Sequence, residues 1–255
     1  MIKVDNIKKR FGEEEILKGI TTVFEKGKTN LIIGQSGSGK SVMVKCLLGL
    51  FRPEEGRIYY EDKAIQDMDD EQQRQLREEI GMLFQGGALF DSMTIEQNVM
   101  FPLRMFTDQK RSDMRDRVND VLKRVALENV NKKFPSEISG GMQKRVSIAR
   151  AIVNRPKYLF CDEPNSGLDP ATATLIDNLI QEITHEYAIT TVVVTHDMNS
   201  VMEIGETIVF LKNGKLVWQG DNTEIFSTDN QDVTDFVYSS NLFKKIRVVQ
   251  LKENG

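Results

Sequence analysis

The chain has 255 residues, of which 40% are hydrophobic and 28% charged, with a formal net charge of -4. This length and balance are typical of a soluble globular protein, and the acidic balance does not favour nucleic acid as a main partner. No apolar run approaches the roughly 18 residues that a membrane-spanning helix needs. The first residues lack the apolar core of a signal peptide, and Cys46 and Cys161 lie in apolar surroundings, so we expect buried free thiols in the cytosol.

The first third of the chain alternates short apolar runs with turn residues. This pattern predicts strands at Ile2–Ile7, Ile16–Val23, Thr29–Ile33, Arg57–Tyr60 and Ile80–Phe84. Apolar residues at helical spacing predict a helix over Gly39–Leu50, and Gln72–Arg77 is predicted as a polar helix.

The middle of the chain is predicted to be mostly helical, over Thr94–Phe106, Lys110–Leu127 and Gly140–Asn154. Strands and helices then alternate again, at Tyr158–Cys161, Ala171–Tyr187, Thr190–Thr195, Asn199–Ile204, Thr207–Leu211 and Lys215–Trp218. Such alternation predicts a parallel sheet with helices on its faces, interrupted by a helical insertion. The tail that begins at Thr228 contains a basic, half-apolar stretch, Lys244–Arg247, that could dock on a partner or simply form a closing helix or strand.

The segment from Gly34 to Ser41 reads GQSGSGKS, which is the pattern of a phosphate-binding loop. Its glycines let backbone N–H groups approach phosphate oxygens, and the helix that follows adds the positive end of its dipole. Lys40 would reach the β- and γ-phosphates, and Ser41 would give a hydroxyl to Mg²⁺. We expect the nucleotide to contact Gly34, Ser36, Gly37, Ser38, Gly39, Lys40 and Ser41. The alternative is a Gly/Ser-rich turn that precedes a lysine by chance.

An apolar predicted strand, Tyr158–Cys161, ends in two carboxylates. Asp162 would lie near Mg²⁺ at the carboxyl end of the strand, where ligands collect in open α/β sheets. Glu163 would then act as the general base for the attacking water. Alternatively, an Asp-Glu pair could merely cap the strand before the turn at Pro164.

A second motif, Ser136–Arg145, reads SEISGGMQKR and resembles the signature of ATP-binding-cassette (ABC) ATPases. The resemblance extends over at least residues 1–226 and includes a Q-loop glutamine, a D-loop, a switch histidine and an aromatic residue for adenine. These are Gln85, the Ser166–Asp169 stretch, His196 and Phe11. The resemblance implies an α/β P-loop NTPase core, in which a mixed sheet with flanking helices carries an antiparallel β N-terminal part and an inserted ABC helical subdomain. Met142 and Asn165 depart from the commonest family residues, Gln and Thr, without removing the base or a phosphate donor.

The resemblance also implies the roles of these residues in a homodimer that binds ATP and Mg²⁺. Ser139, Gly140 and Gly141 would contact the γ-phosphate held by the other copy, and Asp169 would link the two sites. Gln85 would sense Mg²⁺ and water, and His196 would bind the γ-phosphate. Met1 to residue 240 would form one domain, with the helical subdomain at about 86–154 and a tail at 241–255.

The stretch from Met82 to Val99, followed by Phe101–Arg104, is similar to the ATPase of Mla-type phospholipid-trafficking systems. This narrower resemblance implies a permease, an MCE-domain lipid-binding protein, an accessory subunit and a peripheral position on the cytoplasmic face of the inner membrane. Leu89 and Phe90 are expected to be exposed for a permease helix, although they could instead belong to the helical core. The alternatives are the ATPase of a small-solute importer, a soluble ABC protein without a membrane partner, and a regulatory module that does not hydrolyse ATP.

Overall fold

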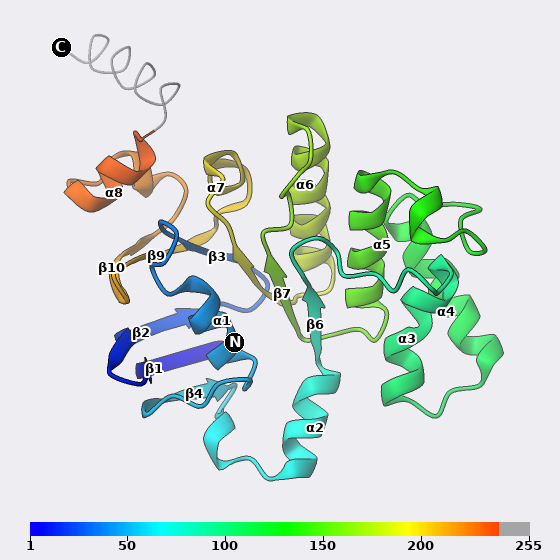
Figure 1. Ribbon diagram of the computed structural model, residues 1–255, viewed down its shortest axis with the longest axis horizontal. Coiled ribbons are helices and arrows are strands. Elements are labelled where there is room, and N and C mark those ends of the chain that lie inside the picture. Colours follow the sequence, from blue (N-terminus) through cyan, green and yellow to red (C-terminus); the bar gives the residue numbers. More distant parts are fainter. Residues whose placement is uncertain (240–255) are drawn as a thin grey trace.

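The computed structural model describes residues 1–239, which form two sheets surrounded by helices (Figure 1). The strands are β1 (Ile2–Phe11), β2 (Glu14–Phe24), β3 (Thr29–Ile33), β4 (Glu55–Tyr60), β5 (Lys63–Ala64), β6 (Ile80–Leu83), β7 (Tyr158–Asp162), β8 (Thr190–Val194), β9 (Thr207–Lys212) and β10 (Lys215–Gly220). The helices are α1 (Lys40–Leu47), α2 (Asp70–Glu78), α3 (Ile95–Phe106), α4 (Arg111–Arg124), α5 (Gly140–Ile152), α6 (Pro170–Glu186), α7 (Met198–Ile204) and α8 (Gln231–Val237). Short 3₁₀ turns lie at Ile65–Asp67, Pro135–Glu137 and Glu224–Phe226.

The larger sheet has the order β10-β9-β3-β8-β7-β6, in which β10 is antiparallel and the other neighbouring strands are parallel. The smaller sheet, β2-β1-β4-β5, is antiparallel. The fold class predicted from the sequence, a mixed sheet with an antiparallel N-terminal part, is therefore confirmed.

Alternation along the buried strands divides the core into two layers. In β3, Leu31 and Ile33 point into the layer that contains α5, α6 and α7, whereas Ile32 points into the layer that contains α1. The second layer joins the two sheets, because Met43 and Leu47 of α1 pack with residues of both. Helix α1 is thus held between the sheets, and the loop of residues 34–39 connects the end of β3 to its N-terminus (Figure 1).

Between β6 and β7 the chain forms helices α3, α4 and α5, which lie to the side of the larger sheet (Figure 1). Thr94 starts α3 with a reciprocal capping box that involves Gln97, and Ser139 caps α5. This is the helical insertion that the sequence predicts.

Each predicted strand and helix is present, with ends that differ by a few residues. The strand at the N-terminus is longer than predicted because β1 pairs with β2 as far as Phe11 and Glu14. Strand β5 and helix α8 were not predicted as separate elements. The predicted role of the basic stretch at 244–247 lies outside the described residues.

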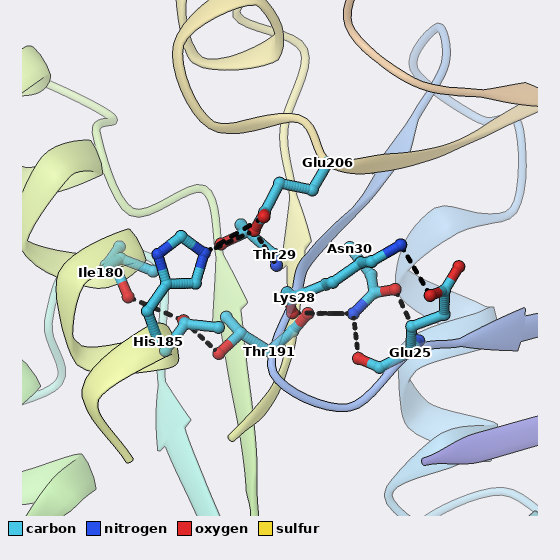
Figure 2. Close-up of polar contacts among 9 residues, drawn as sticks. Glu25, Lys28, Thr29, Asn30, Ile180, His185, Thr191 and Glu206 are labelled. Atoms are coloured by element: carbon cyan, nitrogen blue, oxygen red, sulfur yellow. Dashed lines mark hydrogen bonds and ion pairs between the residues drawn. The ribbon is translucent and has the colours of Figure 1, made fainter. Parts of the chain in front are cut away.

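Polar contacts close the end of the larger sheet at which β3 and β8 begin (Figure 2). The Asn30 amide donates to the carbonyl oxygens of Glu25, Lys28 and Thr191. Glu206 accepts a hydrogen bond from the backbone N–H of Thr29 at 2.8 Å and lies 3.0 Å from Nε2 of His185 on α6. These contacts fix the amino ends of the strands, so the opposite, carboxyl ends remain as the edge for a ligand site.

Candidate functional site

The loop after β3 wraps closely against neighbouring backbone. A Cβ atom at Gly34 would lie 2.3 Å from the carbonyl oxygen of Leu211 and 2.8 Å from Oγ of Ser38, so this position admits only glycine. Gly37 and Gly39 have φ values of 77° and 104°, in the left-handed region. Gly39 is the N-cap of α1 and supplies no side-chain acceptor, which leaves the first N–H groups of the helix available for an anion.

The side chain of Lys40 is held over this loop by backbone carbonyl groups of the loop itself. Its Nζ donates to the carbonyl oxygens of Gly34 at 2.8 Å and Gln35 at 3.0 Å. Burial lowers the pKa of Lys40, while the nearby carboxylates of Glu163 and Asp162 oppose that shift. The ammonium group is therefore positioned where a phosphate could replace its carbonyl acceptors.

The two carboxylates at the end of β7 have different surroundings. Burial raises the pKa of Asp162, as does the adjacent charge of Glu163, whereas Lys40 and Lys45 oppose the rise. Glu163 has a left-handed φ of 47°, and its Oε1 lies 2.8 Å from Nδ1 of His196. A cation between Asp162 and the loop would relieve the cost of holding two adjacent carboxylates there.

Most of the predicted residues line one cleft of about 820 Å³ at the carboxyl ends of the strands. The cleft residues from the predicted set are Gly34, Ser36, Gly37, Gly39, Lys40, Ser41, Gln85, Asp162, Glu163 and His196. The structure therefore brings the loop, the carboxylates, the glutamine and the histidine together. Ser38, which belongs to the same loop, does not line the cleft; it is buried, and its Oγ lacks a hydrogen-bond partner within residues 1–239.

Within residues 1–239, no three His, Cys, Asp or Glu side chains are arranged to bind a metal by themselves. Ser41 and Asp162 nevertheless line the same cleft, next to the phosphate loop. A hydroxyl and one carboxylate fit Mg²⁺, which commonly takes its remaining ligands from phosphates and water.

Phe11 lies outside the lining of this cleft, at the end of β1. Its ring is 46% exposed and meets the edge of Phe51, with centroids 5.2 Å apart. The ring is accessible to an adenine, but the structure does not place it with the other predicted residues.

The signature residues and Asp169 line a different hollow, of about 760 Å³. Ser139 accepts a hydrogen bond from the backbone of Met142, and a Cβ atom at Gly141 would lie 2.9 Å from Cγ2 of Thr172. Asp169 caps α6 by accepting from Thr172 at 3.0 Å. The glycine thus lets α5 and the start of α6 approach, and the two motifs form one surface away from the chain's own phosphate loop.

Two residues that no sequence motif marks, Arg150 and Ser147, hold the loop after Gln85. Arg150 of α5 donates to the carbonyl oxygens of Gly87 at 2.8 Å and Ala88 at 2.9 Å, and only 8% of its surface is exposed. Ser147 donates to the same carbonyl of Gly87 at 3.1 Å. Ser147 and Arg150 are three positions apart on α5, a spacing that could have indicated a shared helix face.

The apolar residues beside Gln85 are divided between surface and core. Phe84 and Phe90 are 47% and 40% exposed. Leu89 is only partly buried and packs against the helical core. The prediction of exposure is therefore confirmed for Phe90 and holds in part for Leu89. None of the helices within residues 1–239 combines the length and apolar character that a membrane crossing requires.

Comparison with known proteins agrees with this geometry. The family model described as "ABC transporter" matches residues 17–166. The chain is 39% identical over 236 residues to the "Probable ribonucleotide transport ATP-binding protein mkl" of Mycobacterium tuberculosis (strain ATCC 25618 / H37Rv), covering 92% of this chain and 66% of that protein. It is 40% identical to the "Methionine import ATP-binding protein MetN" of Clostridium tetani (strain Massachusetts / E88), covering 89% of this chain and 71% of the relative.

Solved structures show the same fold. A dimeric ATP-binding cassette in a post-hydrolysis state, bound to ADP and Pi, matches with a TM-score of 0.78 and 34% identity over 87% of this chain and 99% of that one. The cbiO1 protein of Clostridium perfringens, part of an ABC transporter complex, matches with a TM-score of 0.83 and 31% identity over 99% of this chain and 98% of its own. The chain therefore belongs to the ABC transporter family, in which it is an ABC ATPase.

Proposed function

We propose that two copies of this chain enclose two ATP molecules and hydrolyse them to drive a membrane transporter. The observation that carries the proposal is the separation of the half-sites. Lys40 and Glu163 line one cleft, whereas Ser139 and Asp169 line another. A second copy, facing the first, would supply the signature that one chain cannot bring to its own phosphate loop.

The chemistry follows from the cleft residues. Ser41 and Asp162 would hold Mg²⁺, with Gln85 near it, and the ion would neutralise charge on the β- and γ-phosphates. The Lys40 ammonium and the loop N–H groups would bind the phosphate oxygens. Glu163 would take a proton from the attacking water, since its carboxylate is already oriented by His196.

The remaining contacts would come from outside the cleft. Ser139, Gly140 and Gly141 would donate to the γ-phosphate of the other copy from the start of α5. Asp169, which caps α6 beside them, would connect the two sites. Phe11 would stack on adenine with its exposed ring.

The face beside Gln85 would receive an integral-membrane permease. Phe84 and Phe90 offer exposed apolar surface there. Arg150 and Ser147 tie this loop to α5, so a movement of the permease contact would reach Gln85. The subunit would then lie peripherally on the cytoplasmic face of the inner membrane.

For the cargo we propose phospholipid, delivered with an MCE-domain lipid-binding protein and an accessory subunit. Support comes from the resemblance of residues 82–104 to the ATPase of Mla-type systems. The second candidate is a small-solute importer, which is favoured by the identity of 40% to a protein named for methionine import. The geometry of the ATP cleft does not distinguish these two candidates, because the cargo would not contact that cleft.

Co-purification from the native host would decide between them. The tagged chain is extracted gently in detergent, and its proteins and lipids are identified by mass spectrometry. A permease, an MCE-domain protein and enriched phospholipid are expected. A permease with a solute-binding protein and no lipid enrichment would favour the importer, and recovery without any membrane protein would contradict the transport proposal.

A further inference from the structure

A separate cavity of about 540 Å³ lies at the amino ends of β7 and β8, on the sheet edge opposite the cleft proposed for ATP. This volume is sufficient for a small organic molecule. Four cationic side chains and a single carboxylate make up its charged lining: Lys26, Arg117, Arg155, Lys157 and Glu61. The ATPase chemistry described above uses none of them, so the lining points to a different, anionic ligand.

Two of these five charges are balanced by neighbouring groups. The carboxylate of Glu61 accepts a hydrogen bond from the N-terminal ammonium group of Met1 at 2.7 Å, and another from the hydroxyl of Tyr158 at 3.2 Å. Nζ of Lys157 lies 2.6 Å from Oε1 of Glu79. The three remaining cations of the lining therefore carry the positive charge that faces the cavity.

The guanidinium group of Arg117 is fixed at one wall of the cavity. Its Nε and Nη2 donate to the carbonyl oxygens of Val153 at 2.9 Å and Ile152 at 3.2 Å, at the C-terminal end of α5. These bonds satisfy carbonyl groups that the helix itself leaves free. A guanidinium group has five N–H donors, so three of them remain without a partner among residues 1–239.

Arg155 and Lys26 line the same cavity without any partner. Neither side chain forms an ion pair or a hydrogen bond within the described part of the chain. Burial lowers the pKa of Arg117, and the positive charge of Arg155 lowers it further. An anion bound in the cavity would relieve this repulsion between like charges.

Carboxylates beside the two arginines are the alternative source of balance. Asp113, Asp116 and Asp120 line a neighbouring hollow that also contains Arg117 and Arg155. All three are exposed, and none forms an ion pair with either arginine among residues 1–239. Because solvent and salt screen exposed charges, these carboxylates reduce the repulsion without replacing a bound anion.

Thr190 gives a second, independent indication of a ligand. It lines the cavity at the start of β8 and is fully buried, and its Oγ1 has no hydrogen-bond partner within residues 1–239. Buried hydroxyl groups in folded proteins nearly always have a partner. Thr29, at the start of the adjacent β3, is also buried with an unpartnered hydroxyl, but it does not line this cavity. An oxyanion in the cavity would accept a hydrogen bond from Thr190.

We propose that this cavity binds a small phosphate monoester. Two arginines and a lysine match the two negative charges of such a group, and planar guanidinium groups suit phosphate oxygens. Tyr187, which is 41% exposed, adds an aromatic wall for the organic part of the ligand. Because Arg117 belongs to α4 and Thr190 begins β8, the ligand joins the helical insertion to the larger sheet.

Phenyl phosphate, which carries its phosphate on an aromatic ring, is a suitable probe. Isothermal titration calorimetry with the full chain at pH 8 should give a Kd below about 1 mM. At about ten times the Kd, the probe should raise the Tm by about 3 °C. Inorganic phosphate, which lacks the ring, should bind at least about fivefold more weakly. Equal affinities for the two probes would overturn the assignment of an organic ligand.

Arg155→Gln removes one charge from the cavity and should weaken phenyl phosphate binding at least about tenfold. Arg111→Gln is the matched control, because it removes an exposed arginine from the start of α4 outside the cavity lining. It should change the Kd by less than about twofold. A similar Kd in both variants would contradict the proposed site.

Thr190→Val and Thr29→Val form a second matched pair. Each removes a buried hydroxyl that has no partner within residues 1–239, so neither variant should lower the Tm. Only Thr190→Val should weaken phenyl phosphate binding, by about threefold or more. Equal Kd values in the two variants would show that the Thr190 hydroxyl does not contact the ligand, and would count against the proposal.

Lys40→Ala separates this cavity from the phosphate loop. This variant should bind phenyl phosphate like the wild type but bind ATP more weakly, whereas Arg155→Gln should show the reverse. If Lys40→Ala lost phenyl phosphate binding and Arg155→Gln kept it, the probe would occupy the ATP cleft. The proposed cavity would then be wrong while the ATPase function stands. Failure of the wild type to bind phenyl phosphate at all would also overturn the proposal.

Discussion

Nδ1 of His196 lies 2.8 Å from Oε1 of Glu163, although the two residues are 33 positions apart in the chain. Glu163 directly follows β7 and begins the turn there, and His196 lies just beyond β8, the neighbouring parallel strand. A carboxylate only accepts hydrogen bonds, so Nδ1 of His196 donates to it and leaves Nε2 free for a ligand. The pairing orients the base before any substrate arrives.

Glu163→Gln removes the base and keeps the shape of the side chain. The amide oxygen of the new residue can still accept from His196, so we expect ATP binding and ATP-dependent dimerisation to persist. We expect kcat to fall at least about 100-fold, the range for a lost general base. Steady-state phosphate release and size-exclusion chromatography with ATP measure the two effects, and full turnover would show that another group is the base.

Lys40→Ala removes the cation from the phosphate loop. We expect the Kd for ATP to rise roughly 100-fold, because a charged hydrogen bond to phosphate contributes about 1.5–3 kcal/mol. Isothermal titration calorimetry measures the change. Lys18→Ala on β2, which removes an exposed cation outside the cleft, is the control and should bind ATP like the wild type. Equal affinities in both variants would exclude the phosphate-loop assignment.

The sequence predicted the fold and the cleft because both depend on local patterns. Gly34 and Lys40 lie within one loop, and Asp162 and Glu163 end one apolar strand. By contrast, Arg150 was not predicted to hold the loop after Gln85. That contact joins residues more than 60 positions apart through backbone carbonyls, which carry no residue-type signal.

Arg150→Met tests the contact with the loop after Gln85. The substitution removes two charged hydrogen bonds and leaves the carbonyl groups of Gly87 and Ala88 without these donors. We expect the free energy of unfolding to fall by about 2–3 kcal/mol, as measured by urea denaturation. Arg104→Met on the exposed side of α3 should change it by less than about 0.5 kcal/mol. A matching small change in both variants would mean that the Arg150 contacts contribute little.

Asp177 of α6 gives the protein a pH-dependent stability. It is 2% exposed, and burial raises its pKa to about 6, while the side chains of Ser200 and Asn165 oppose the rise. The charges of Asp197 and Glu203, on the facing α7 segment, raise it further. The folded protein therefore binds a proton more tightly at Asp177 than the unfolded chain, in which the carboxyl has its ordinary pKa of 3.8.

Protonation of Asp177 therefore favours the folded state. Between about pH 4 and pH 6 the folded state holds more protons, so the free energy of unfolding decreases as the pH rises, and the loss is complete above pH 6. The shift from 3.8 to about 6 corresponds to at most about 3 kcal/mol. Asp177→Asn removes the charge and keeps the size and shape of the side chain.

We therefore expect Asp177→Asn to be more stable than the wild type at pH 8, by an amount that shrinks as the pH falls to 5. Urea denaturation of both proteins at pH 5, 6, 7 and 8 measures the difference. Asp116→Asn, which changes an exposed carboxylate on α4, should show no such trend. A stability difference that stays constant from pH 5 to pH 8 would mean that Asp177 is not the titrating group, because an amide and a protonated carboxyl differ only when the carboxyl loses its proton.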